Sequence, residues 1–344
     1  MKEPLISVIV LTYNQEDTIA RTLNSVLAQC CSAPFEVVVG DDCSTDGTRH
    51  ICEAYAKQHP DTIRLMPATA NKGVVDNYYD CFEACRGEYI ADCAGDDFWT
   101  DKYKLEKEWK VLAANANVTV VHTNWNRYYE DTKREVANKE VPFASPVTRG
   151  SLMLESIITQ TTAPVIHLCT AMYRAKVLRE FYNTNRALLR NKEFGCEDLQ
   201  IAFVLAHQGD VAYLPETTLD YSVGHTSVSC LPDSAQQFRF VQRTASLSWL
   251  LASHFNLDTP RTRAFFALKS YELLMHAFRC HNTALRSEAL EYANEWRVAL
   301  GKKARCVMWV TKYPLLWRAA LLLRKGLVGL KSGSKNSVFR VLLF

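Results

Sequence analysis

The chain has 344 residues, of which 48% are hydrophobic and 22% are charged, and its formal net charge is +3. These values are typical of a globular protein of about two domains with ample chain to bury a core. The twelve cysteines form no small-domain framework, so we interpret them as free thiols in a reducing cytosol and exclude a disulfide-rich scaffold. Ten Lys or Arg residues and no acid occur from Gly301 to Phe344, but the remaining chain has no basic stripe, so nucleic acid is not an expected partner.

The first 122 residues alternate between short apolar runs, typical of buried strands, and segments with helical periodicity. Strands are predicted at 6–11, 35–39, 63–66, from 89 onwards and at 118–122. Helices are predicted at 16–29, around 51–55, at 74–85 and at 105–114. Regular alternation of this kind predicts an α/β fold with a mostly parallel, doubly wound sheet and right-handed crossovers. No basic n-region and apolar h-region precede the first strand, so secretion is not expected.

The fourth predicted strand ends in two adjacent acids, Asp96 and Asp97, followed by Phe98 and Trp99. Ligands of open α/β sheets usually bind at the carboxyl ends of the strands. Two like charges side by side are costly unless a cation compensates them, so the pair indicates a divalent metal with oxygen ligands. The alternative is an ordinary surface turn, in which paired Asp residues are common.

The pattern weakens between Asn124 and Pro164, where we expect irregular structure. A strand is predicted at 165–173 and a helix at 176–182. A further helix is predicted to begin near Glu197 and Asp198 and to end at Gly209, followed by a strand at 211–214. This part of the chain is expected to complete the sheet.

The last third changes to long helical segments, predicted at 235–254, 260–280 and 282–300. The final segment places Leu316, Ala320 and Leu323 on one face and Arg318 on the other, as basic amphipathic helices at membrane interfaces do. We therefore expect residues 304–335 to contact an anionic membrane surface without spanning the membrane, because charges interrupt every run of about 20 apolar residues. The alternative is a helix that packs on the protein and exposes a solvated basic face.

Four pieces of the chain, Ser7–Asn14, Gly40–Thr48, Arg86–Ile90 and Gly95–Trp99, follow one another in a specific order. In this order they resemble the inverting family 2 glycosyltransferases of GT-A fold. A fifth piece looks like the acceptor half of that family, with Glu197-Asp198, Gly209–Leu214, Tyr221, His225, Ser227 and Ser229. The resemblance implies a GT-A catalytic domain at 1–232, with a nucleotide-sugar half at about 1–122 and an acceptor half at about 123–232. An α-helical region at 233–344 would follow it.

The resemblance also implies roles for residues on the donor side. Thr12 and Tyr13 would border the nucleotide base, and Asp42 would hydrogen-bond to it. Asp96 corresponds to the last acid of the family's DxD motif, which binds the metal of the metal–diphosphate complex, and Asp97 is a candidate for support. Asp46 of the same loop is interpreted as a simple helix cap.

On the acceptor side, Asp198 matches the family's catalytic base, and Glu197 is a candidate for support. The alternative for this pair is two acids that stabilise a helix N-terminus through the macrodipole. His225 falls where some GT-A enzymes place a further metal or diphosphate contact.

The first acid of the family's DxD motif corresponds to Ala94 in this chain. Asp97 and Asp92 are the nearby acids that would compensate, although Asp92 shares a strand face with Ala94. The departure implies weaker metal binding or an altered choice of donor.

We therefore expect an inverting glycosyltransferase that uses Mn²⁺ or Mg²⁺ and a nucleotide-diphosphate sugar, most simply a UDP-sugar. The expected acceptor is a glycan or a lipid-linked sugar of surface polysaccharide synthesis, and the expected location is the cytoplasm, with peripheral attachment to the inner face of the cell membrane. A catalytically inactive family member that acts as a nucleotide-binding or membrane-associated scaffold is the alternative, favoured by Ala94. A nucleotidyltransferase is disfavoured, because Thr12 to Gln15 supply no Gly-rich, basic phosphate loop.

Overall fold

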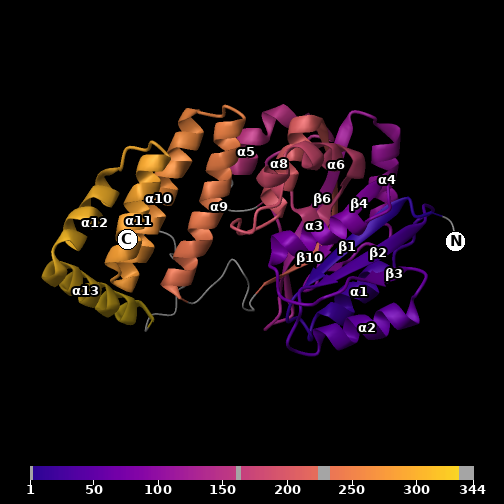
Figure 1. Cartoon of the computed structure of the whole chain (residues 1–344), viewed down its shortest axis with the longest axis horizontal. Coiled ribbons are helices and arrows are strands. Elements are labelled where there is room, and N and C mark those ends of the chain that lie inside the picture. The colour runs from indigo at the N-terminus through magenta and orange to yellow at the C-terminus, as the bar shows by residue number, and fades with distance from the viewer. Residues whose placement is uncertain (1–2, 160–163, 224–232, 333–344) are drawn as a thin grey trace. The chain divides into compact units, whose positions relative to one another are not determined.

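The computed structural model describes residues 3–159, 164–223 and 233–332, with side chains up to Arg324 (Figure 1). The chain divides into two compact units, 1–225 and 226–344. The predicted boundary after residue 232 lies at the end of an undescribed stretch and stays a prediction. Every cysteine that the structure describes is a free thiol.

The first unit is built on a ten-stranded sheet of order β3-β2-β1-β4-β9-β6-β10-β5, in which β7 also pairs with β6 and β8 with β10. Its first half is parallel and contains β1 (Ile6–Thr12), β2 (Phe35–Asp41), β3 (Ile63–Leu65) and β4 (Tyr89–Ala94). The connecting helices are α1 (Ile19–Leu27), α2 (Thr48–Gln58) and α3 (Val74–Ala84). The predicted α/β class and the strands and helices of this half are confirmed.

Helices cover both faces of this half of the sheet (Figure 1). Ile6, Val8 and Val10 of β1 alternate along the strand and share one apolar core with Ile19 and Leu23 of α1. The other face is covered by α3, which is in contact with β1 and β2. The sheet is therefore doubly wound, and its parallel strands are buried on both sides.

The second half of the sheet is mixed. β9 (Ala171–Arg174) runs antiparallel to β4 and β6, while β6 (Val118–Tyr129) and β10 (Asp210–Val223) are parallel to each other. The short strands β5 (Phe98–Trp99), β7 (Arg134–Ala137) and β8 (Val147–Arg149) pair antiparallel at its margins. The accompanying helices are α4 (Lys104–Ala114), α5 (Leu154–Ile158), α6 (Ala175–Thr184), α7 (Arg186–Leu189) and α8 (Asp198–Gln208), with a 3₁₀ turn at Gly150–Leu152.

Two predictions for this half are wrong in part. The region from Asn124 to Pro164 is less irregular than expected, because β6 continues to Tyr129 and forms a hairpin with β7. The strand predicted at 165–173 begins only at Ala171. A 3₁₀ turn at Leu168–Thr170 precedes it, and the Thr170 hydroxyl closes that turn by donating to the His167 carbonyl at 2.7 Å.

The second unit consists of five helices in the described residues: α9 (Ser234–His254), α10 (Pro260–Cys280), α11 (Thr283–Glu295), α12 (Lys302–Lys312) and α13 (Pro314–Ser332). The first three begin at side-chain caps, since Asp233, Thr259 and Asn282 each accept hydrogen bonds from backbone N–H groups of the first turn. The helix predicted at 282–300 ends at Glu295. The predicted helical character of this region is confirmed.

Within the described residues, no single helix is both long and apolar enough to cross a membrane. The pair formed by α12 and the Pro314–Arg324 part of α13 meets the length and composition requirement only jointly, and the two helices are bent by 119° relative to each other.

Candidate functional site

The corner between β4 and β5, which carries Asp96 and Asp97, is hydrogen-bonded to the end of β1 and to the start of α1. The Gly95 N–H donates to the Leu11 carbonyl at 2.8 Å, and the Gly95 carbonyl accepts from the hydroxyls of Thr18 and Thr22. A Cβ at Gly95 would lie 2.7 Å from Thr12 Oγ1, so the close approach requires glycine. The corner is therefore held directly beside the predicted nucleotide residue Thr12.

The two adjacent acids have different environments. Asp97 is fully buried, and its Oδ1 accepts from the Ser222 N–H at 2.9 Å. Burial first, and then the charge of Asp96, raise the pKa of Asp97 well above its ordinary value, which favours the protonated form of this carboxyl. Asp96 is only half-buried. Asp97 thus links the corner to β10, while Asp96 lies nearer to solvent.

Arg21 of α1 holds the same corner from outside, an arrangement that sequence reasoning missed. Its guanidinium donates to the Asp96 carbonyl at 3.0 Å and to Glu130 Oε1 at 2.5 Å, and it lies 4.2 Å from the ring centroid of Phe98. Partial burial alone would raise the pKa of Glu130, but hydrogen bonds from Arg21, Lys133 and Ser222 lower it to about 2. The backbone of Asp96 is therefore fixed by a charged network.

The predicted nucleotide residues lie together at the carboxyl edge of the parallel strands. Thr12 pairs in register with Asp41, and the neighbouring Leu11 pairs with Ala94, which places the ends of β1, β2 and β4 in one row. Tyr13 is 46% exposed beside this row. The predicted residues Thr12, Tyr13, Asp42 and Asp96 are thus brought to one edge of the sheet.

Asp42 is engaged with the loop that starts α3. Its Oδ1 and Oδ2 each accept a hydrogen bond at 2.9 Å, from the N–H groups of Lys72 and Gly73 respectively. A ligand that hydrogen-bonds to Asp42 would therefore share this carboxylate with the loop. Asp46 accepts from the Thr48 N–H at 3.0 Å, in keeping with its interpretation as a cap.

Glu197 and Asp198 lie at the N-terminus of α8, with Glu197 as the N-cap residue and Asp198 in the first turn. Both are half-buried. Burial first, and then the charge of Asp198, raise the pKa of Glu197 to about 8, so at neutral pH Glu197 holds a proton. The Oδ1 of Asp198 accepts from the Leu199 N–H at 2.8 Å.

Tyr221 lies on β10, in register with Arg127 of β6. Burial raises the pKa of its phenol, and the carboxylates of Asp97, Asp96 and Asp198 act in the same direction. The candidate site comprises the corner that carries Asp96 and the start of α8, which carries Asp198.

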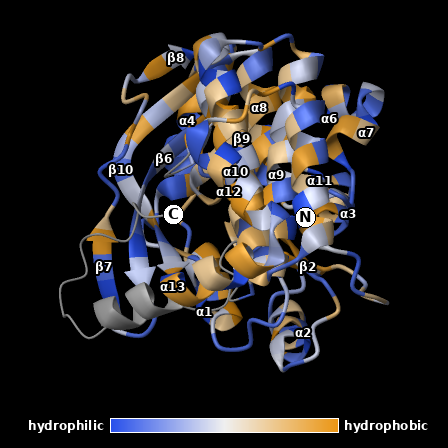
Figure 2. Cartoon of the chain, turned by 90° about the vertical axis from the view of Figure 1, so that its left-hand side faces the viewer, coloured by the Kyte–Doolittle hydropathy of each residue, from blue (hydrophilic) through white to orange (hydrophobic). Residues whose placement is uncertain are grey.

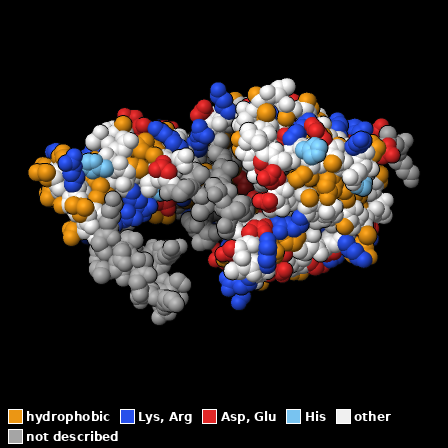
Figure 3. Space-filling view, turned by 90° about the horizontal axis from the view of Figure 1, so that it is seen from below, with side chains coloured by type: hydrophobic (Ala, Val, Ile, Leu, Met, Phe, Trp, Pro, Cys, Tyr) orange, Lys and Arg blue, Asp and Glu red, His pale blue; other side chains and the backbone are white. Residues whose placement is uncertain are grey.

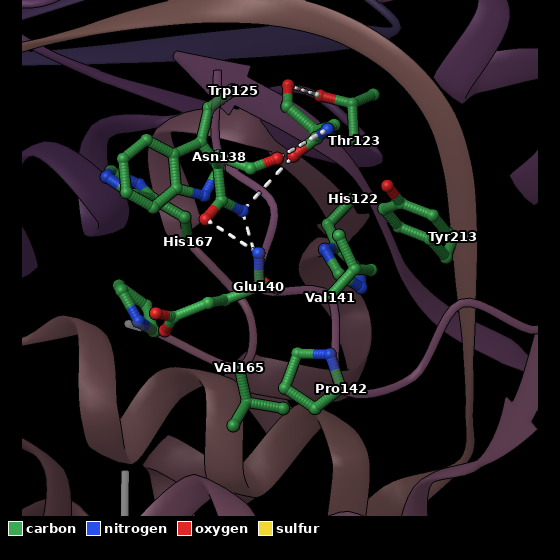
Figure 4. Close-up of a pocket in the computed structure, with 12 residues that line it drawn as sticks. His122, Thr123, Trp125, Asn138, Glu140, Val141, Pro142, Val165, His167 and Tyr213 are labelled. Atoms are coloured by element: carbon green, nitrogen blue, oxygen red, sulfur yellow. Dashed lines mark hydrogen bonds between the residues drawn. The ribbon is translucent and has the colours of Figure 1, made fainter. Parts of the chain in front are cut away.

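An aromatic cluster next to Tyr221 borders a small pocket (Figure 4). The rings of Trp125, His167 and Tyr221 lie with centroids 5.1 to 5.6 Å apart. Burial lowers the pKa of His167 to about 4, while the nearby charge of Asp96 acts in the opposite direction. At neutral pH this part of the site therefore offers an uncharged imidazole and aromatic surface, which suits a neutral, hydroxyl-rich ligand.

The pocket also contains a network of amide side chains. Asn138 donates to Asn124 Oδ1 at 3.2 Å, and its own Oδ1 accepts from the Glu140 N–H at 3.3 Å, as Figure 4 shows. Burial lowers the pKa of His122 to about 4, and its Nε2 has no hydrogen-bond partner in the described part of the chain. The predicted irregular region thus contributes a hydrogen-bonded side-chain network to the lining of this pocket.

Arg190 anchors the segment that leads to Glu197 and Asp198. It donates to Asp76 and Asp80 of α3 at 2.6 Å each, and Lys72 pairs with the other oxygen of Asp80 at 2.5 Å. Since Lys72 also binds Asp42 through its backbone, the nucleotide edge and the approach to α8 share one chain of contacts.

Comparisons with known proteins decide the family. Residues 7–182, just over half of the chain, match the family model described as Glycosyl transferase family 2. The chain belongs to glycosyltransferase family 2.

Relatives agree with this assignment but extend beyond the matched segment. An uncharacterized protein of Mycobacterium tuberculosis, Rv1520, is 31% identical over 62% of this chain and 58% of its own length. The UDP-Glc:α-D-GlcNAc-diphosphoundecaprenol β-1,3-glucosyltransferase WfgD of Escherichia coli is 30% identical over 36% of this chain and 47% of its own. The matched segments thus span less than two thirds of these relatives.

Solved structures show the same fold. TarS of S. aureus, residues 1–349 in complex with UDP-GlcNAc, has a TM-score of 0.52 at 17% identity, over 84% of this chain and 91% of the TarS chain. The mannosyltransferase PcManGT of Pyrobaculum calidifontis, in complex with GDP-Man and Mn²⁺, has a TM-score of 0.52 at 20% identity, over 94% and 89%. The predicted GT-A fold is confirmed.

The predicted metal site can be compared with the oxygen ligands that the described residues offer. In the residues that the structure describes, no group of three or more His, Cys, Asp or Glu side chains is placed to hold a metal ion. A Mg²⁺-type ion bound with a diphosphate needs only one or two protein carboxylates, and the half-buried Asp96 of this glycosyltransferase provides one. Ala94 provides none, Asp97 is buried and accepts a hydrogen bond from Ser222, and His225 lies outside the described residues.

Proposed function

We propose that this family 2 glycosyltransferase transfers a sugar, with inversion, from a nucleotide-diphosphate sugar to an acceptor hydroxyl in the presence of Mn²⁺ or Mg²⁺. The observations that support the proposal are the ends of β1, β2 and β4 in one row, with Thr12 and Asp96 at that edge, and Asp198 in the first turn of α8. Asp96 then acts on the diphosphate leaving group, and Asp198 acts on the attacking acceptor hydroxyl.

On the donor side, Thr12, Tyr13 and Asp42 bind the nucleotide, and a UDP-sugar is the donor that we propose first. Asp96 would hold the divalent cation together with diphosphate oxygens and water. That cation, when bound, supplies positive charge to the departing diphosphate. The network of Arg21 and Glu130 keeps the backbone of Asp96 in place.

On the acceptor side, Asp198 takes the proton of the acceptor hydroxyl as its oxygen attacks the anomeric carbon. The bond from that carbon to the diphosphate oxygen breaks on the opposite side of the sugar, which inverts the anomeric centre. Glu197 supports the reaction because, with a pKa of about 8, it places no negative charge beside Asp198 at neutral pH. The neutral wall of Trp125, His167 and Tyr221 is the surface against which we place the acceptor.

The acceptor class that we propose is a glycan or lipid-linked sugar of surface polysaccharide synthesis, on the cytoplasmic side of a cell membrane. Support comes from relatives in this class of synthesis, since WfgD is named for a diphosphoundecaprenol-linked acceptor.

The test is a screen of nucleotide-sugar donors for nucleotide release and transfer with Mn²⁺ or Mg²⁺. Wild-type protein is expected to turn over at least one donor, and Asp96→Ala and Asp198→Asn are expected to lose that activity. If both variants behave like wild type, the assigned roles are wrong.

Ala94 favours a second candidate, a family member that binds nucleotide without turnover and acts as a scaffold. Titration calorimetry with nucleotides separates the two candidates. A scaffold gives binding heat but no product with any donor and acceptor pair.

A further inference from the structure

The helices α12 and α13 expose an unusual concentration of apolar side chains. Six of the twelve large hydrophobic residues that are exposed in the described chain lie within this short segment: Trp309, Tyr313, Leu315, Leu316, Leu322 and Leu323. Leu315 is 80% exposed and Leu323 71%. Contiguous exposed apolar surface of this kind marks a binding site for another molecule.

The inner face of α13 is already occupied. Trp317 is buried, its indole N–H donates to the Phe278 carbonyl of α10 at 2.9 Å, and its ring stacks on Phe278. At 3.6 residues per turn, Leu315 and Leu322 point away from Trp317. The helix is therefore apolar on its packed side and on its outer side (Figure 2), which is typical of helices in a protein core or at a membrane.

The outer side differs from the one that the sequence pattern predicted. Leu316 and Leu323 are exposed as expected, but Ala320 is only half-exposed, and Leu315 and Leu322 join the exposed face instead. The packing of Trp317 against α10 determines which side of α13 faces away from the protein.

Positive charge surrounds the exposed apolar face. The described basic residues from 302 to 324 are Lys302, Lys303, Arg305, Lys312, Arg318 and Arg324. The last acid of the chain is Glu295, and none of these six forms an ion pair with a described acid. Figure 3 shows hydrophobic side chains beside Lys and Arg at the left end of the view.

We propose that α12 and α13 form a docking surface for the anionic face of a lipid bilayer. Leu315, Leu322 and Leu323 enter the boundary between headgroups and acyl chains, and the Lys and Arg side chains contact lipid phosphates. Trp309 and Tyr313 lie at headgroup depth, where their rings are most favourable. This inference adds to the proposed function and does not depend on it, since the surface belongs to the second unit alone.

The experiment is co-sedimentation of the full chain with vesicles of phosphatidylcholine alone or mixed with phosphatidylglycerol. Wild-type protein is expected to bind the mixed vesicles, to bind phosphatidylcholine weakly, and to be released by salt. The double variant Leu315→Glu, Leu322→Glu is expected to lose binding. The matched control is Leu250→Glu, Leu268→Glu, which changes two exposed leucines, 39% and 43% exposed, on α9 and α10 and is expected to bind like wild type.

Circular dichroism establishes that both variants remain folded, and Trp309→Phe is expected to reduce the quenching of tryptophan fluorescence by brominated lipids. Unchanged vesicle binding by Leu315→Glu, Leu322→Glu overturns the proposal. So does resistance of bound wild-type protein to alkaline carbonate, which would mean that the bent pair inserts across the bilayer. A wild-type dimer that the same variant converts to a monomer, without vesicle binding by either, assigns the face to a second copy and equally overturns it.

Discussion

Replacing Asp97 by Asn tests whether the two adjacent acids have separate roles. Asp97 is fully buried, its Oδ1 accepts from the Ser222 N–H at 2.9 Å, and burial together with the charge of Asp96 raises its pKa well above the ordinary value. A protonated Asp and an Asn have nearly the same shape, and both retain an oxygen acceptor for Ser222.

The expected change in the free energy of unfolding follows from the hydrogen bond between the Ser222 N–H and Asp97 Oδ1. Asp97→Asn keeps the hydrogen bond, so in acidic solution, where the Asp97 carboxyl is protonated in both the folded and the unfolded protein, the free energy of unfolding is expected to change by less than about 1 kcal/mol. Asp97→Ala leaves the buried Ser222 N–H without its acceptor and is expected to cost about 1–3 kcal/mol. Because the folded pKa of Asp97 is raised, wild-type protein loses stability as pH rises from the ordinary pKa towards the folded one, and the Asn variant, which does not titrate, gains stability relative to it over that range.

The assay combines urea unfolding at acidic, neutral and alkaline pH with metal-dependent nucleotide release from the donor. Asp97→Asn is expected to retain turnover, whereas the matched neighbour Asp96→Asn loses it. If a stably folded Asp97→Asn loses metal-dependent turnover, Asp97 is ionised and contacts the metal, and the division of roles is refuted.

Three further changes test other parts of the account. Arg190→Gln removes the guanidinium that donates to Asp76 and Asp80, so the rate of sugar transfer is expected to fall while UDP affinity is retained. Arg190→Lys is expected to recover only part of the activity, and steady-state kinetics in which both variants matched wild type would contradict this. Asp92 is buried with a pKa of about 8 against an ordinary 3.8, so native protein binds more protons than unfolded protein between these values and loses stability as pH rises through them. Asp92→Asn should flatten the pH dependence of the free energy of unfolding by at most about 6 kcal/mol, and an unchanged slope would disprove it. Gly95→Ala places a Cβ 2.7 Å from Thr12 Oγ1 and should lower stability by about 1–3 kcal/mol in thermal unfolding; wild-type stability would show that the corner is not tightly packed.

The sequence predicted the elements whose pattern is local. The apolar runs of β1, β2 and β4 and the periodicity of α1 and α3 are visible in the chain itself, because burial on both faces leaves only apolar positions. The ends of β6 and β10 were missed. Past Thr123 and Leu214 these strands carry polar and aromatic residues, and their pairing passes through register shifts between Leu214 and Leu219 that a local pattern does not contain.

The sequence predicted the acidic residues of the candidate site, but it did not predict how deeply each is buried or which groups it contacts. Asp96 and Asp97 look alike in the sequence, and only the approach of Ser222 from β10 distinguishes the buried acid Asp97 from the half-buried Asp96. Arg21 and Arg190 appeared as ordinary helix and loop charges, since their partners Glu130 and Asp80 are distant in the chain. Such roles arise from tertiary contacts and left no local signal.

The central claim is that Asp96 serves the donor and Asp198 serves the acceptor. The most direct measurement is calorimetric titration of UDP with Mn²⁺ alongside transfer rates for Asp96→Asn, Asp198→Asn and wild type. The account predicts that Asp198→Asn binds UDP like wild type while transfer falls by about 10²–10⁴-fold, and that Asp96→Asn loses the metal-dependent part of UDP binding. Wild-type transfer by Asp198→Asn, or undiminished metal-dependent binding by Asp96→Asn, would contradict it.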